Sequence, residues 1–306
     1  MNKNILLLLT FLVSMNASAQ LTLNFGKNVY YKAEVELEDG TIKSGYVLDF
    51  QNKPVISNQM VNTLSAFNPK ERNLGLANRF YHFRKDKNAK NEKIPISDIR
   101  SINLYKHNNL TNKETEHRFQ KTKVAKFQKG DKIKYYNGDY LLPVYYSNAK
   151  LTIFHYNLVS CTNKDKSNCY VDPINFYFQA NDNEYAILPI HVIGSDIFSP
   201  NNVALRFNNS IEYFGKNCPN FLNKYKEQLS DVTQLITTNN KNEYDDFIQF
   251  RTSYLEDLKK NKKKMKKKEY KIYAEERLEQ YSTESANHFY NKVYDEIVSL
   301  YIKNCE

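Results

Sequence analysis

The hydrophobic pattern of this chain changes its period near residue 200, and this change limits the choice of fold. Up to about residue 195, apolar residues alternate with polar ones in short runs rich in Tyr and Phe, which is typical of strands. Beyond residue 200 they recur at three- and four-residue steps, as on one face of a helix. The pattern therefore predicts an α+β protein, with antiparallel β-rich N-terminal and middle regions and a C-terminal helical region.

Residues 27–105 are predicted to form a small β module that is barrel-like. Asp39-Gly40 is a turn signal between two alternating runs, and residues 51–78 are polar and expected to form a loop. The strands expected in this module cover 29–37, 41–50, 79–84 and 94–105.

Residues 106–195 are predicted to form a second antiparallel β region. Its first part, 106–131, is polar and is expected to link the two regions. Two hairpins follow, with strands over 140–146 and 151–159 and over 175–179 and 185–190. The many aromatic residues here are explained by sheet packing, since Tyr and Phe favour strands.

Residues 200–304 are predicted to be helical. Short helices are expected over 203–214 and 219–229, where Pro219 occupies a favoured first-turn position. A long helix is expected over 243–281, and Ser282 or Thr283 is expected to cap a last amphipathic helix. The last helix is predicted to pack on the long one as a helical hairpin.

The N-terminus has the pattern of an export signal. Lys3 precedes an apolar run over 5–13, and Ala17-Ser18-Ala19 supplies small residues before a cleavage site. Residues 1–19 are therefore predicted to be a signal peptide cleaved between Ala19 and Gln20. The apolar run is too short to span a bilayer, which needs about 20 residues. The mature chain is expected to have no transmembrane span and to be periplasmic or secreted.

Four cysteines remain after the predicted cleavage: Cys161, Cys169, Cys218 and Cys305. In an exported protein they allow two disulfides in three connectivities, or four free buried thiols. Cys161 and Cys169 flank one polar loop, so a bridge there would hold that loop. A bridge between Cys218 and Cys305 would tie the C-terminus to the body of the protein.

Positive charge is concentrated in one short segment, 259–271, which reads KKNKKKMKKKEYK. Its nine lysines and one glutamate carry a net charge of +8, within a formal net charge of +10 for the whole chain. One interpretation is contact with an anionic surface; the other is a solvated helix charged for solubility. The candidate contact residues are Lys259, Lys260, Lys262, Lys263, Lys264, Lys266, Lys267 and Lys268. Nucleic acid is an unlikely partner, because the chain has only eight arginines and the segment lacks interleaved aromatic residues.

No local motif predicts catalysis, a metal site or a cofactor. The six histidines form no HxH, HxxH or HExxH pattern, and there is no GxSxG, Walker A or GxGxxG motif. His155 and His191 lie in apolar runs and are expected to be core or edge histidines. If a deep polar pocket joined either one to Asp or Glu, the alternative function would be a hydrolase with a site formed by loops of the β region.

Several motifs together resemble uncharacterised secreted or periplasmic proteins of Bacteroidota-type bacteria. These are the export signal, the hairpin ELEDGTIKSGYV, a tyrosine-rich middle, and the aromatic pair Tyr213-Phe214 followed by Cys218-Pro219 and a helix. The resemblance implies an envelope or secreted location and no particular activity. With the lysine-rich segment, it indicates an envelope-associated binding or structural protein. The expected partner is an anionic envelope component or another envelope protein.

Overall fold

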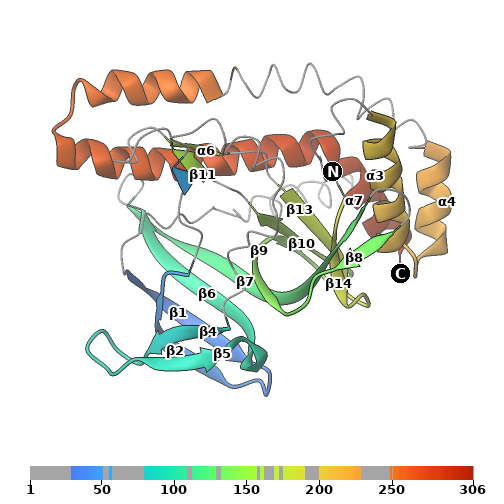
Figure 1. Cartoon of the computed structure of the whole chain (residues 1–306), viewed down its shortest axis with the longest axis horizontal. Coiled ribbons are helices and arrows are strands. Elements are labelled where there is room, and N and C mark those ends of the chain that lie inside the picture. The colour runs from blue at the N-terminus through green and yellow to red at the C-terminus, as the bar shows by residue number, and fades with distance from the viewer. Residues whose placement is uncertain are drawn as a thin grey trace, which may run out of the picture.

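The computed structural model has an α+β architecture, with a strand-rich N-terminal and middle part followed by helices. Figure 1 shows the helices α3 (Pro200–Phe214), α6 (Lys267–Val293) and α7 (Asp295–Asn304) on one side of a large curved sheet. The residues that the structure describes are 29–50, 55–56, 79–108, 112–128, 132–156, 159–161, 169–171, 175–189, 200–228, 249 and 251–305. The predicted signal peptide, with Ala19 and Gln20, and His191 lie outside the described residues.

The N-terminal strands lie in the spatial order β5-β4-β2-β1-β6-β7, all antiparallel to their neighbours. The expected turn joins the first two strands, with Gly40 at φ +84° and the Asp39 carboxylate accepting the Thr41 N–H at 2.8 Å. The strands are β1 (Tyr30–Leu37), β2 (Ile42–Leu48), β4 (Phe80–Arg84), β5 (Glu92–Pro95), β6 (Ile99–Asn108) and β7 (Lys113–Phe127).

The expected linker over 106–131 is instead the end of β6 and the long strand β7, which joins both halves of the sheet. Its sequence looks polar because every second side chain faces away from the core, while His117 and Phe119 are buried. β7 pairs with β6 along its first part, and then with β9 and β14. Pairing on both edges holds this strand in place despite its weak apolar pattern.

Five strands close into a ring, β7-β9-β10-β13-β14, because β14 returns to pair in parallel with β7. The ring closure thus lies in the second predicted β region, which is not purely antiparallel. Among the described strands, those of residues 27–105 other than β3 (Val55–Ile56) form the open side of the same sheet. The remaining strands are β8 (Ile133–Tyr135), β9 (Tyr140–Ser147), β10 (Leu151–Tyr156), β13 (Asn175–Ala180) and β14 (Tyr185–Leu188), with a small separate sheet of β3 (Val55–Ile56), β11 (Val159–Cys161) and β12 (Cys169–Val171).

β10 is buried on both faces and separates two hydrophobic clusters. Leu151 and Ile153 belong to the cluster beneath the helices, whereas Phe154 and Tyr156 belong to the cluster shared with the N-terminal strands. This alternation follows from the two-residue period of a strand. Both predicted hairpins in this region are present, as β9–β10 and β13–β14.

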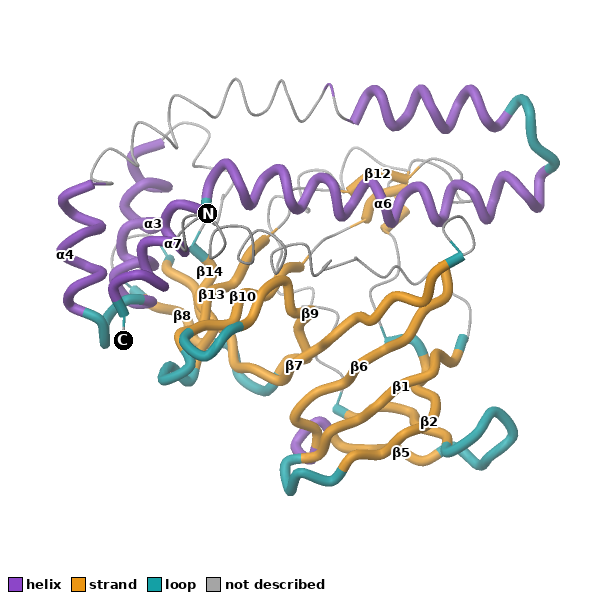
Figure 2. Tube along the Cα trace, turned by 180° about the vertical axis from the view of Figure 1, so that it is seen from behind, coloured by secondary structure: helices purple, strands orange, loops and turns teal. Residues whose placement is uncertain are grey.

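The two short helices are present as α3 (Pro200–Phe214) and α4 (Pro219–Gln228), but the predicted long helix over 243–281 is wrong. A helix over 251–262 ends in a turn at 263–266, and α6 (Lys267–Val293) runs back beside it (Figure 2). The break falls in the lysine run, where like charges repel at helical spacing.

The predicted cap at Ser282 or Thr283 is also wrong, since both residues lie inside α6. The Ser282 hydroxyl donates to the Leu278 carbonyl at 2.8 Å, and the Thr283 hydroxyl donates to the Glu279 carbonyl at 3.2 Å. Serine and threonine inside a helix can form such bonds to the carbonyl four residues earlier. The last helix, α7 (Asp295–Asn304), begins only after Tyr294.

The Cys218–Cys305 disulfide is present and joins the start of α4 to the end of α7, with a Cα–Cα distance of 5.6 Å. The backbones of Cys161 and Cys169 are direct partners in the antiparallel pair β11–β12. Such partners are within the Cα separation that a disulfide needs, about 4.4–6.8 Å. The side chains of this second pair are not among those that the structure describes, so its bridge stays a prediction.

Candidate anion-binding site

The lysine-rich segment forms the tip of the helical hairpin. Three of the candidate lysines end the helix over 251–262, three lie in the turn at 263–266, and two begin α6. In Figure 1 this tip is at the opposite end of the molecule from α3, α4 and the C-terminus. The side chains of Lys259, Lys260, Lys262, Lys263, Lys264, Lys266, Lys267 and Lys268 are all exposed.

The charge of this lysine tip is largely uncompensated by nearby acids. Apart from Lys262, none of the eight candidate lysines has a carboxylate within ion-pair distance in the part of the chain that the structure describes. The Lys262 ammonium lies over the Tyr270 ring, 5.8 Å from its centroid. Glu269 is the one acid of the segment, and its carboxylate accepts the backbone N–H of Lys266 at 3.2 Å. The tip therefore presents strong positive charge to solvent.

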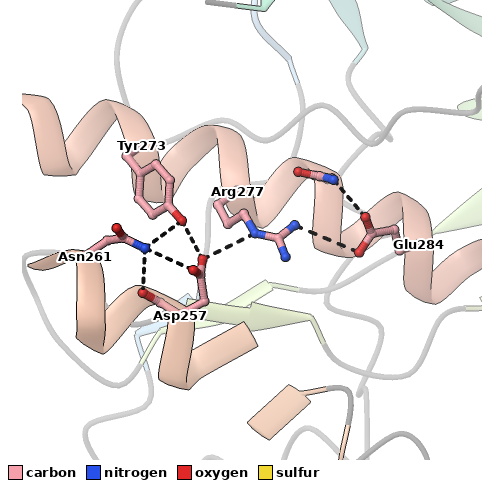
Figure 3. Close-up of polar contacts among 6 residues, drawn as sticks. Asp257, Asn261, Tyr273, Arg277 and Glu284 are labelled. Atoms are coloured by element: carbon pink, nitrogen blue, oxygen red, sulfur yellow. Dashed lines mark hydrogen bonds and ion pairs between the residues drawn. The ribbon is translucent and has the colours of Figure 1, made fainter. Parts of the chain in front are cut away.

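A polar network braces the two helices directly behind the tip (Figure 3). The Asp257 carboxylate accepts the Tyr273 hydroxyl at 2.5 Å and the Arg277 Nε–H at 3.4 Å. The Asn261 amide donates to the Tyr273 hydroxyl at 3.0 Å and to Asp257 Oδ1 at 2.9 Å. Three of these bonds cross from one helix to the other, and the bond between Asn261 and Asp257 lies within the first helix. The crossing bonds hold the turn in one geometry against the repulsion between lysines.

An apolar seam continues the brace toward the body of the protein. The rings of Tyr254 and Tyr281 stack with centroids 4.3 Å apart and an interplanar angle of 15°. Leu258, Tyr270 and Leu278 are buried in the same hydrophobic cluster. The hairpin is thus fixed by packing as well as by hydrogen bonds.

Tyr273→Phe tests the brace without changing the charge of the tip. The lost hydroxyl leaves Asp257 and Asn261 with one partner fewer each, so the free energy of unfolding should fall by about 1–2 kcal/mol. Chemical denaturation of the variant measures the change. Tyr30→Phe on β1 is the matched control and should change stability by less than about 0.5 kcal/mol. Equal effects of the two substitutions would show that the network does not stabilise the hairpin.

A cluster of buried titratable side chains lies where α6 packs on the N-terminal strands. His117 Nε2 on β7 lies 3.8 Å from Glu279 Oε1 on α6, with side-chain exposures of 2% and 17%. Burial raises the pKa of Glu279, the carboxylates of Glu276 and Asp49 add to this, and Lys106 opposes it. This cluster was missed in the sequence analysis, because its members come from α6, β7, β6 and the residue Asp49 after β2, and share no local motif.

The hydrolase alternative depended on His155 or His191 meeting an acid in a pocket. His155 lies on β10 with its ring centroid 6.0 Å from that of Tyr145, and neither of its nitrogens has a hydrogen-bond partner among the residues that the structure describes. Burial lowers the pKa of His155 to about 4, so the imidazole is neutral at physiological pH. Among the described residues no group of His, Cys, Asp and Glu is arranged to hold a metal ion. Among the described residues, none therefore forms an acid–base pair with His155.

Within the described part of the chain, no helix combines the length and apolarity required to cross a bilayer. Comparison of the chain with models of known protein families, with curated proteins and with solved structures finds no match.

Proposed function

We propose that this protein is an exported, envelope-associated binding protein that uses the lysine tip to contact an anionic surface. The observation that carries the proposal is the position of the charge. A net charge of +8 lies on exposed side chains at the end of a braced hairpin, while the rest of the chain is close to neutral. Concentrated positive charge attracts anionic partners and speeds their encounter.

Export is supported by two independent features. The N-terminus has the n-region, apolar run and small residues of a cleaved signal, and Cys218 and Cys305 form a disulfide. We expect the mature protein to begin at Gln20 and to be recovered from the periplasm or the medium. N-terminal sequencing of the fractionated protein tests this, and an uncleaved chain confined to the cytoplasm would contradict it.

Neutralising the tip should abolish binding to polyanions. In Lys262→Gln/Lys263→Gln/Lys264→Gln/Lys266→Gln, the free energy of binding should weaken by about 1 kcal/mol per lysine. The total of about 4 kcal/mol corresponds to about 1000-fold in affinity at low salt. Sedimentation with anionic vesicles and retention on lipopolysaccharide or an acidic polysaccharide measure the change. Salt-sensitive binding of the mature protein to any one of these probes is sufficient to support the proposed function.

A matched control separates the tip from overall charge. Lys85→Gln/Lys87→Gln/Lys90→Gln/Lys93→Gln removes the same charge from exposed positions around the β4–β5 turn. This variant should retain most of the binding. If the mature protein binds none of the probes, or if the two quadruple variants lose affinity equally, the proposed function is wrong.

A further inference from the structure

We propose that the partner of the lysine tip is the headgroup plane of a phospholipid bilayer that contains anionic lipids, which the hairpin meets end-on. This inference rests on the proposed function and narrows it to one class of partner.

The chemistry of the tip favours lipid phosphates over a protein surface. Segment 259–271 contains nine lysines and no arginine. A lysine ammonium is a strongly hydrated point charge, whereas the planar arginine fork makes the paired bonds that recognise a carboxylate in a fixed geometry. Protein interfaces are enriched in arginine and aromatic residues and depleted in lysine. An array of lysines alone suits a fluid plane of phosphates, where no fixed geometry has to be matched.

The aromatic residues near the tip are buried or hydrogen-bonded within the hairpin. This disfavours sugars and nucleic-acid bases as ligands of the tip. Tyr254 and Tyr270 are buried, and the Tyr273 hydroxyl takes part in the brace. Recognition of single-stranded nucleic acid depends on free ring faces on which bases stack, and the flat faces of sugars call for the same kind of surface. The tip offers charge without such a platform.

The lysines are gathered at one end of the hairpin. They are exposed residues of the end of one helix, the turn, and the start of the next, and this turn lies at one end of the molecule (Figure 1). Because the brace holds the turn, these charges can approach a flat surface together with little loss of backbone freedom.

One exposed apolar side chain lies next to the tip and could contact the lipid headgroup region. Ile272 is 42% exposed and follows Lys268 by four residues on α6, so both lie on the same helix face. No large apolar side chain within 259–271 is exposed among the described residues. Contact is therefore expected to be peripheral, dominated by charge, and reversible by salt, with a shallow contribution from Ile272.

The test compares vesicles with a soluble polyanion. The mature protein is sedimented with phosphatidylcholine vesicles, with and without phosphatidylglycerol, and is titrated separately with dextran sulfate, at about 50 mM and about 300 mM salt. We expect binding to the vesicles that contain phosphatidylglycerol and not to those of phosphatidylcholine alone, whether or not dextran sulfate also binds. This vesicle binding should be lost in the tip quadruple variant, retained in the β4–β5 variant and weakened at least 10-fold by the higher salt. Ile272→Ser should weaken vesicle binding about threefold and leave any binding of dextran sulfate unchanged, with circular dichroism confirming that the variants are folded.

The outcomes separate this inference from the proposed function. Tip-dependent binding of dextran sulfate without binding of vesicles would overturn the bilayer assignment and leave the anionic-surface function standing. Equal binding to vesicles with and without phosphatidylglycerol would also overturn the assignment. Vesicle binding that the tip variant retains in full would overturn both proposals, as would the absence of binding to every anionic probe.

Discussion

Removal of the Cys218–Cys305 disulfide is expected to lower the free energy of unfolding by about 4–5 kcal/mol. The bridge joins residues separated by 87 positions. The loop that it closes therefore contains α4, the helical hairpin and α7. A cross-link over so long a loop removes much conformational entropy from the unfolded chain, which is why the expected effect is large.

The variant for this measurement is Cys218→Ala/Cys305→Ala, because a single substitution would leave one reactive thiol. Guanidinium unfolding of the mature protein gives the change in free energy. The corresponding variant at Cys161 and Cys169 is the natural comparison, since its predicted bridge closes a much shorter loop and should contribute only about 2–3 kcal/mol. A loss below about 1 kcal/mol at Cys218 and Cys305 would mean that this bridge does not stabilise the native protein.

The second large effect is expected at His155, whose replacement should remove part of the protein's sensitivity to acid. The folded state lowers the pKa of His155 from 6.5 to about 4, and the cause is burial. Between these pH values the unfolded chain binds a proton at this position and the folded protein does not. Above about pH 6.5, His155 is neutral in both states and does not lower the free energy of unfolding. As the pH falls from 6.5 toward 4, protonation of the unfolded chain at this position lowers the free energy of unfolding by about 3 kcal/mol in total.

His155→Leu keeps a similar volume and eliminates the titration. At pH 7 the variant should be at least as stable as the natural protein, because two ring nitrogens without hydrogen-bond partners are replaced by apolar atoms. The difference in unfolding free energy between variant and natural protein should grow by about 3 kcal/mol from pH 7 to pH 4. Measuring this difference cancels the contribution of other titrating groups, including Glu279.

His107→Leu, at an exposed position on β6, is the control for the pH series. It should leave the loss of stability in acid unchanged. If His155→Leu has the same pH dependence as the natural protein, His155 is hydrated or charged in the folded state and its assignment here is incorrect.

The elements that could be predicted are those whose pattern is local. The Asp39-Gly40 turn, the hairpins β9–β10 and β13–β14, and the helices α3 and α4 lie where turn residues and apolar periodicity predict them. The exposed lysines were also predictable as a candidate contact segment, because a run of like charge cannot be buried.

The elements that were missed depend on partners far along the chain. β7 has a polar sequence and forms a strand because β6, β9 and β14 supply hydrogen bonds along both of its edges. The hairpin turn lies at 263–266 because Tyr254 and Leu258 pack against residues of α6 such as Tyr281, which a single helical pattern over 243–281 cannot indicate. The cluster of Glu279, His117 and Lys106 exists only once α6 lies on the sheet.

The amino-acid sequence by itself determined where strands give way to helices, where the charge is concentrated, and that the N-terminus has the pattern of an export signal. These properties depend on neighbours within a few residues, so the linear order of side chains is enough to specify them. Only the tertiary structure decided that five strands close into a ring, that Cys218 meets Cys305, and that the lysines occupy the tip of a braced hairpin. Those outcomes depend on packing and hydrogen bonds between residues tens of positions apart, whose combined free energy no local pattern contains.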